Sequence, residues 1–505
     1  MNVARNTISN VVLSLSKGLA GLFLIPFFVA QVGKENYGII VLILGIIGYA
    51  DLFDLGLKQA LVRNLSAEKQ EEQEENELFA TALAGSFLYF LASFIFLLLV
   101  MVLFGRSFGI PEAVLYSPAI YIFIFLYLLV NIISPVFSAL LLSKNRFDLV
   151  NYRASFFSLL GIGLTILLVW LTDLSYYAWM LAVLTAKILE LLVLLALVKK
   201  YFPHLEIHVR HYRRSRLGSL LSFGWKMLIS KWNRKIKFDS DQLIISYFMG
   251  PVAVALYRPG AALVQSIRPI VSSMAGQLFV SASKAHRDEN KKALRALLFF
   301  GSKFTVLAYL PVFFLLLFLG DWIIELWLGR VYQAEDLRLI FRVMVLWSLI
   351  DLFFYLEGSS YSVLFGIDQL DFMIKADFMI SLLNIAASVF LIKYFNAGLT
   401  GVLIPGVCIE LFARIGFFIN TAKRIGITLK ECLMEYFIPL FLAFVLVFVP
   451  LWLVHLQHFT PWIRISSVVV ILALFYPMLC WKLALNHEER TLLSARLRKF
   501  LPFLS

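Results

Sequence analysis

Apolar runs long enough to cross a lipid bilayer follow one another along nearly the whole chain. About 20 apolar residues span the hydrocarbon core as a helix, and a helix satisfies its backbone hydrogen bonds within its own segment. Of the 505 residues, 61% are hydrophobic and 15% are charged, whereas soluble proteins carry about 25% charged residues. The sequence therefore predicts an all-α, polytopic membrane protein embedded in a lipid bilayer.

The runs predict about fourteen membrane-spanning helices. We expect the first run to be a span and not a cleaved signal, because it is longer than a signal's apolar region and contains Lys17 and Pro26. The predicted spans are residues 8–30, 38–58, 78–104, 117–142, 150–171, 177–198, 219–248, 252–280, 294–319, 335–364, 371–394, 398–421, 433–454 and 464–486.

The net charge of +13 has a topological explanation. In a soluble domain it would suggest nucleic-acid binding. Here the basic residues gather in alternate loops, which is the pattern of cytoplasmic loops in membrane proteins. We therefore expect no nucleic-acid partner, a location in the cytoplasmic (cell inner) membrane, and both termini in the cytoplasm. The acidic run over residues 68–77 is expected to be a solvated helical turn without a chemical role.

A long basic loop suggests how the chain is organised. The loop over residues 199–216 follows the sixth predicted span. The segment that starts at Phe27 resembles the segment that starts at Tyr247, at an offset of about 220 residues, and carriers are often built from two such repeats. The predicted parts are a first six-helix lobe at 1–198, a basic linker at 199–218, a second six-helix lobe at 219–421, and two further helices with a tail at 422–505.

The predicted span over residues 219–248 is unusually charged. On a helix, one stripe carries Lys226, Ser230, Asn233, Lys237 and Asp241, and the opposite stripe is apolar. A charge in hydrocarbon costs at least about 2.5 kcal/mol, so the polar stripe must face water, protein or an anionic ligand. Two interpretations remain open: a cationic face that lines a cavity, or a segment that lies partly at the level of the lipid headgroups.

Cations inside the predicted spans are candidates for anion binding, because an ionisable group at membrane depth is functional by default. Five of them lie in the first, seventh or eighth span, and each of these helices opens or follows the opening of a predicted lobe. These candidate ligands of an anionic substrate are Lys17, Lys226, Lys237, Arg258 and Arg268.

Other intramembrane charges are expected to bind one another. Lys187 and Glu190 have the i, i+3 spacing of an ion pair on one helix, and Glu410 and Arg414 have the i, i+4 spacing. Lys303, at the start of the ninth span, is expected either to lie at the headgroups or to belong to a site.

No enzyme signature is found in the sequence. It contains no phosphate-binding loop of the Walker type, and its three cysteines are too far apart for a metal site or a disulfide framework. The acidic residues lie without a companion histidine or nucleophile. We therefore expect a transporter that is not an enzyme, has no cofactor or bound metal, and is driven by an ion gradient.

A family resemblance sharpens this expectation. The N-terminal sequence NTISNVVLSLSKGLAGLFLIPFFVAQVGKENYGI and the following GYADLFDLGLKQALVR resemble bacterial O-antigen flippases of the Wzx type. These flippases belong to the multidrug/oligosaccharidyl-lipid/polysaccharide (MOP) exporter superfamily. The motif consists of Asp54, Leu55, Gly56 and Leu57, followed by Arg63.

The resemblance implies a fold and a function. The fold would be two six-helix lobes, as in multidrug exporters of the MATE type, around a central cavity, with two extra C-terminal helices. The function would be to flip undecaprenyl-diphosphate-linked oligosaccharides, for O-antigen and other lipopolysaccharide or polysaccharide biosynthesis, by alternating access. A polysaccharide polymerase and a chain-length regulator would be partners. The cationic candidates suit a diphosphate, whose charges could not cross hydrocarbon unshielded.

The resemblance also implies a coupling ion, Na⁺ or H⁺, because similar lipid II flippases place a sodium site in this region. Asp377 and Asn384 share a helix face, and Asp239 and Asp241 would meet them if the seventh and eleventh spans are neighbours. These four residues are the ion-coupling candidates.

Three alternatives stay open at this point. One is a cation-coupled drug or small-solute exporter of the same fold, although such exporters favour acidic cavities. Another is a lipid II flippase. The third is a membrane enzyme acting on a lipid-linked glycan, which would be expected to show a large extracytoplasmic loop. The sequence leaves the identity of the glycan, the coupling ion and the oligomeric state open.

Overall fold

The structure is a computed structural model in which every regular element is a helix, so the predicted all-α class is confirmed for the described residues. The described residues are 2–53, 56–66, 71–172, 174, 176–206, 208–268, 291–367, 369–457, 459–487 and 489–491.

The chain divides into two compact units, Met1–Pro259 and Gly260–Ser505. A helix over residues 251–268 carries the chain from one to the other. The elements of the first unit are α1 (Asn2–Gly48), η1 (Tyr49–Phe53), α2 (Leu57–Leu65), α3 (Glu72–Phe104), α4 (Glu112–Leu115), α5 (Pro118–Ser143), α6 (Phe147–Leu171), α7 (Tyr176–Tyr201), η2 (Val209–His211) and α8 (Arg214–Met249).

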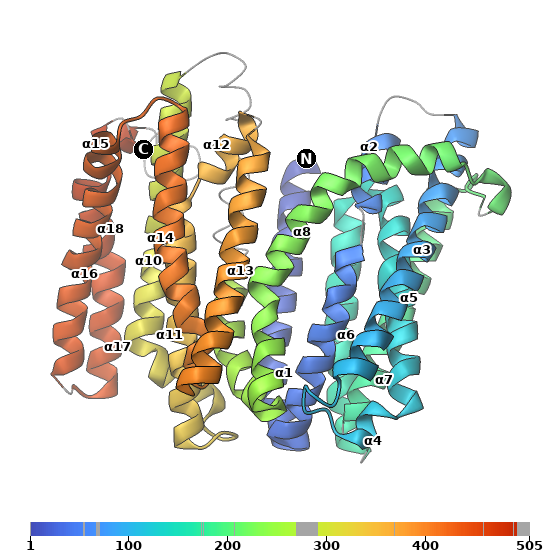
Figure 1. The fold of residues 1–505 in the computed structure, drawn as a ribbon, viewed down its shortest axis with the longest axis horizontal. Helices are drawn as coiled ribbons and strands as arrows, with labels where there is room; N and C mark the ends of the chain where they lie inside the picture. The colour runs from blue at the N-terminus through green and yellow to red at the C-terminus, as the bar shows by residue number, and fades with distance from the viewer. Residues whose placement is uncertain are drawn as a thin grey trace. The chain divides into compact units, whose positions relative to one another are not determined.

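The second unit is a bundle in which α11 packs against α10 and α14, and α10 also contacts α16 and α17 (Figure 1). Its elements are α10 (Lys291–Leu328), α11 (Ala334–Glu357), α12 (Ser360–Gly366), α13 (Leu370–Phe395), α14 (Thr400–Arg424), α15 (Leu429–Cys432), η3 (Leu433–Phe437), α16 (Ile438–Leu456), α17 (Pro461–Val470), η4 (Ile471–Phe475), α18 (Tyr476–Leu479) and η5 (Cys480–Ala484).

Within the described residues, eleven helices are long and apolar enough to cross a membrane. The first of them, in α1, contains the kink at Gly33, where φ is 81° and α1 divides into the two helices that the sequence predicts. The charged helix α8 and the helix over residues 251–268 are not among these eleven, but they lie where the sequence predicts the seventh and eighth spans. With these two and the division of α1, the fold agrees with the prediction of about fourteen membrane helices in an all-α protein.

The unit boundary at Pro259 differs from the linker predicted at residues 199–218. In this structure α8 packs against α1, α2 and α3, so it belongs to the first compact unit. Whether the helices repeat as lobes 1–198 and 219–421 remains a prediction.

The path of α8 is not that of a single straight span. Figure 1 shows its first part crossing the end of the unit beside α2, and its second part running alongside α1. Its contacts with α2, α3 and α1 agree with that path. The path supports the interpretation in which the first part of residues 219–248 lies near the headgroups.

Ion pairs between the N-terminus of α3 and the residues around the start of α8 hold this end of α8. At the N-terminus of α3, Glu75 lies 2.7 Å from the Nε2 atom of His204, and Glu77 accepts a hydrogen bond of 3.0 Å from Arg213. Glu74 accepts a hydrogen bond of 3.0 Å from Arg216. The expectation that this acidic run is merely solvated is therefore wrong, because its carboxylates bind residues of the basic linker. The linker lies against the N-terminal part of α3.

The predicted span over residues 335–364 is also interrupted. α11 ends at Glu357, and Gly358 follows with a φ of 49°, which favours glycine. A Cβ atom at Gly358 would collide with Ser302 of α10. The hydroxyl of Ser302 accepts a hydrogen bond of 3.0 Å from the backbone N–H of Ser359. The chain therefore breaks the helix where it packs closely against α10.

Candidate functional site

Arg414 on α14 is buried among three carboxylates of the second unit. Its Nε donates to Glu410 at 2.6 Å, its Nη2 donates to Asp377 at 3.1 Å, and its Nη1 donates to Glu357. Its side chain is 1% exposed. The predicted Glu410–Arg414 pair is confirmed, but it belongs to a larger network of three acids around one base. A buried excess of negative charge favours uptake of a proton or another cation.

The ion-coupling candidates divide between the two units. Asp377 contacts Arg414, and Asn384, two turns farther along α13, has a buried amide oxygen without a hydrogen-bond partner among the described residues. On α8, Asp239 pairs with Lys235 at 2.7 Å. Asp377 is thus already engaged by a guanidinium, while Asn384 retains an open acceptor.

Asp241 on α8 is buried, with 4% of its surface exposed. Its Oδ2 accepts a hydrogen bond of 2.9 Å from the hydroxyl of Tyr257, which lies on the helix over residues 251–268. Its Oδ1 has no hydrogen-bond partner among the described residues. A buried carboxylate with one open oxygen can accept a proton or bind a cation.

The candidate anion ligands have different surroundings. Lys17 lies on α1, and Lys226 and Lys237 lie on α8, but their side chains are outside the described residues. Arg258 is partly buried and lies within electrostatic reach of the buried Tyr37. The structure therefore describes a side chain for Arg258 and Arg268 of the five candidates.

Arg268 is already bound to an acidic residue. Its Nε donates to both oxygens of Asp351, at 2.8 and 2.9 Å, and its Nη2 contacts the same carboxylate. Its guanidinium also lies 5.1 Å from the ring centroid of the buried Trp347. Because Asp351 is fully buried, this pair supports the packing of α11 against the helix over residues 251–268.

A second buried arginine was missed by the sequence analysis. Arg153 on α6 is 8% exposed, and its Nη2 lies 3.3 Å from Ser138 and 3.5 Å from Glu190. The predicted Lys187–Glu190 pair is confirmed at 2.9 Å, so Glu190 has two cationic neighbours. Arg153 stands near the start of the predicted span 150–171, where arginines are common at the headgroups. The signal that could have indicated a buried arginine is its position three residues inside that predicted span.

The motif residues lie around a turn. Asp54 and Leu55 are outside the described residues. Gly56 has a φ of 70° and precedes α2, a conformation that glycine adopts without strain. Leu57 is buried in the first unit, and Arg63 lies in the last turn of α2. The glycine and the leucine thus have a structural reason to be there.

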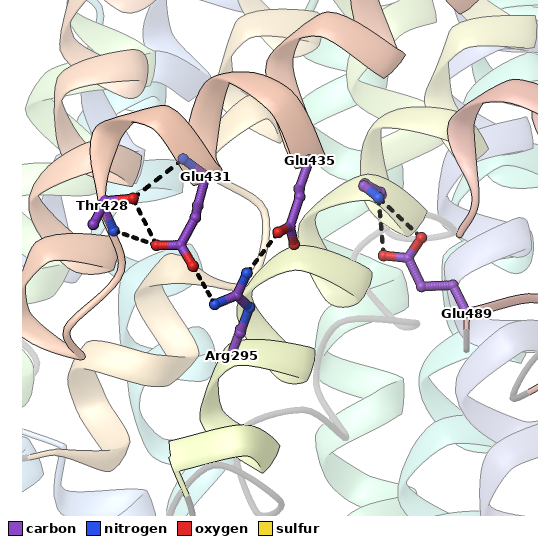
Figure 2. Close-up of polar contacts among 6 residues, drawn as sticks. Arg295, Thr428, Glu431, Glu435 and Glu489 are labelled. Carbon is purple, nitrogen blue, oxygen red and sulfur yellow. Dashed lines mark hydrogen bonds and ion pairs between the residues drawn. The ribbon is translucent and has the colours of Figure 1, made fainter. Parts of the chain in front are cut away.

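The C-terminal helices are attached to α10 by ion pairs. Figure 2 shows Arg295 between Glu431 and Glu435. Its Nη1 donates to Glu431 at 2.5 Å, and its Nη2 donates to Glu435 at 2.6 Å. Lys303 is 2% exposed and donates to both oxygens of Glu489, at 3.0 and 2.9 Å. The headgroup expectation for Lys303 is wrong in this structure, because the lysine is buried against a residue that follows the last spanning helix. Its place in a site stays a prediction.

Comparison with known proteins places this geometry in a family. A family model described as polysaccharide biosynthesis protein matches residues 3–280. A protein of Shigella flexneri, described as a candidate O-antigen transporter, is 23% identical over 349 residues, which are 67% of this chain and 80% of that protein.

Solved structures share the fold. The lipid II flippase MurJ, in an inward closed conformation, superposes with a TM-score of 0.65 at 18% identity, over 94% of this chain and 99% of that one. An inward-facing multidrug transporter of the MATE family superposes with a TM-score of 0.58 at 18% identity, over 84% of this chain and 98% of that one. The chain therefore has the fold of the MOP superfamily.

Proposed function

This chain belongs to the family of polysaccharide biosynthesis proteins, and we propose on that premise that it is a flippase for lipid-linked oligosaccharides. The substrate would be an undecaprenyl-diphosphate-linked oligosaccharide such as an O-antigen repeat unit, moved across the cytoplasmic membrane by alternating access. The family match over more than half of the chain carries the proposal, and the relative described as a candidate O-antigen transporter supports the substrate class.

A cationic cavity is part of this proposal, because a diphosphate needs nearby positive charge to leave water. The proposed ligands are Lys17, Lys226, Lys237, Arg258 and Arg268. Asp351 already accepts hydrogen bonds from the guanidinium of Arg268. A phosphate would have to replace that carboxylate, so we expect Arg268 to contribute to structure as well as to binding.

Coupling to a Na⁺ or H⁺ gradient is also part of the proposal. It is supported by the open Oδ1 of Asp241 and by the acid excess around Arg414, to which Asp377 contributes. Asp239 and Asn384 complete the proposed coupling set. Dissipating the sodium gradient and the proton gradient separately would identify the ion, and transport that survives both treatments would rule out this coupling.

The proposal includes a location and partners. We place the protein in the inner membrane with both termini in the cytoplasm, on the basis of the alternating basic loops. A polymerase and a chain-length regulator would receive the flipped units. A reporter that is active only in the cytoplasm should work when fused after Ser505, and activity of a periplasm-only reporter there would contradict the topology.

Complementation tests the function directly in cells. In a strain that lacks its own O-antigen flippase, the wild-type chain should restore surface glycan. Arg258→Ala should abolish most of that display at unchanged membrane abundance, since it removes a charge worth on the order of 4 kcal/mol at 4 Å before solvent compensation. Arg258→Lys should restore part of it if charge alone matters.

The matched control is Lys375→Ala, because Lys375 is an exposed cation on α13 and is not among the proposed ligands. It should display normal glycan. Normal display by alanine variants at most of the five ligand positions would instead mean that the cationic cavity is not where we propose it.

A further inference from the structure

The guanidinium of Arg153 is buried without enough acceptors. Its Nη2 lies 3.3 Å from the Ser138 hydroxyl, and the nearest oxygen of Glu190 lies at 3.5 Å, which is long for a hydrogen bond. Its Nε and Nη1 have no hydrogen-bond partner among the described residues. Leaving a buried donor unpaired is unfavourable, and more so for a charged group. Two of the three guanidinium nitrogens therefore remain available to an acceptor.

The surrounding charges leave this arginine incompletely neutralised. Glu190 is the acidic partner of Arg153, and its other oxygen accepts a hydrogen bond of 2.9 Å from Lys187. One carboxylate thus serves two cations. Because both Arg153 and Glu190 are less than 10% exposed, water compensates little of the remaining positive charge. An anion that approached Arg153 would meet open donors and uncompensated charge together.

Three helices hold this arrangement in place. Ser138 lies on α5, Arg153 on α6, and Lys187 and Glu190 on α7. These helices pack against one another, and α1 packs along α6 (Figure 1). The arginine is therefore fixed on regular elements, which position a binding group more sharply than a loop does.

We propose that Arg153 is a ligand for a phosphate oxygen of the lipid-linked diphosphate. The inference rests on the proposed function and adds to it a residue of the first unit. Arginine is always charged and donates strong hydrogen bonds to phosphate. Since Arg153 is buried in this conformation, the proposal includes a second conformation in which the contacts around α6 open to the substrate.

Binding to two matched lipids tests the proposal. The purified full-length protein in phosphatidylcholine nanodiscs is titrated with undecaprenyl diphosphate and with undecaprenol, which has the same tail and no phosphate. The decisive variant is Arg153→Gln combined with Glu190→Gln, because it removes both members of the pair and leaves no unpaired buried charge. Lys200→Gln is the control, since it removes an exposed cation of the same helix and leaves Arg153, Glu190 and Lys187 in place.

The proposal predicts that the double variant binds undecaprenyl diphosphate about tenfold more weakly than wild type, the loss expected for charge-assisted hydrogen bonds. Its binding of undecaprenol and its melting temperature should not change. Lys200→Gln should bind the diphosphate within about twofold of wild type, because an exposed cation outside this arrangement contributes little.

Other outcomes overturn the proposal. If the double variant binds the diphosphate as wild type does, Arg153 is only a member of a structural ion pair. If phosphatidylglycerol competes as well as undecaprenyl diphosphate, the anion is a membrane lipid and the substrate assignment is wrong. If wild type does not prefer the diphosphate over undecaprenol, the proposed function itself fails. If the double variant does not fold, the Arg153→Lys variant tests the proposal instead. Unchanged diphosphate binding by Arg153→Lys would mean that the guanidinium donors do not bind the phosphate.

Discussion

Arg153 in the first unit and Arg414 in the second are both buried, yet their surroundings are opposite. Arg414 has a carboxylate for each of its three nitrogens, from Glu357, Asp377 and Glu410. Arg153 has two nitrogens without a partner among the described residues and shares its acid with Lys187. A saturated guanidinium holds helices together, whereas an unsaturated one can receive a ligand.

The largest expected effect follows from removing the saturated arginine. Arg414→Met leaves two buried carboxylates and one partly exposed carboxylate without their cation and should destabilise the second unit by about 3–5 kcal/mol. Membrane abundance and the melting temperature of the purified protein measure this. Arg424→Met is the control, because Arg424 lies exposed at the end of the same helix and should matter little. Equal melting temperatures for the two variants would show that Arg414 does not have the structural role that we assign to it.

Removing the unsaturated arginine should cost less stability. Arg153→Met leaves Glu190 paired with Lys187, so we expect a loss of about 1–3 kcal/mol and a folded protein in the membrane. Surface glycan should nevertheless fall steeply. If this variant unfolds as readily as Arg414→Met, the contrast between the two arginines is wrong, because both would then be structural.

Much of this arrangement was predictable. The spans, the all-α class, and the Lys187–Glu190 and Glu410–Arg414 pairs follow from hydrophobic runs and helix spacing, which are local properties of the sequence. The break of α1 near Gly33 fits the gap left between the first two predicted spans.

The remainder depends on contacts between residues that are distant in the sequence. The Lys303–Glu489 pair joins α10 to the segment after the last span, and no spacing rule connects residues so far apart. The pairing of the acidic run with His204 and Arg213 depends on the linker folding back over α3. Arg153 was overlooked because its position at the start of a span is equally typical of a headgroup residue.

A smaller effect on stability is expected from neutralising one excess acid near Arg414. Asp377→Asn keeps Glu357 and Glu410 on the guanidinium and should leave folding almost unchanged, since Asp377 is the more exposed of the three. If the acid excess couples transport to an ion, the variant should lose its response to the gradient. Glycan export measured with and without ionophores checks this. A normal gradient response in Asp377→Asn would exclude this residue from coupling.

The smallest effect is expected at the ion pairs between α3 and the start of α8. Glu77→Arg should cost less than about 1 kcal/mol, because Arg213 is half exposed and water screens the pair. The charge swap Glu77→Arg with Arg213→Glu should recover most of the loss at low salt. A melting temperature that the swap lowers further would mean that Glu77 acts through other neighbours, such as Arg216.

Reconstituted translocation is the most direct test of the central proposal that this protein flips a lipid-linked oligosaccharide. Liposomes containing the purified protein and an undecaprenyl-diphosphate-linked oligosaccharide are treated on the outside with an enzyme that cleaves accessible glycan. We expect cleavage of nearly all the lipid with wild-type protein and of only the outer half with empty liposomes. With the Arg153→Gln/Glu190→Gln variant, the inner half should be cleaved more slowly than with wild type. Cleavage limited to the outer half with folded wild-type protein, under an imposed sodium or proton gradient, would contradict the account.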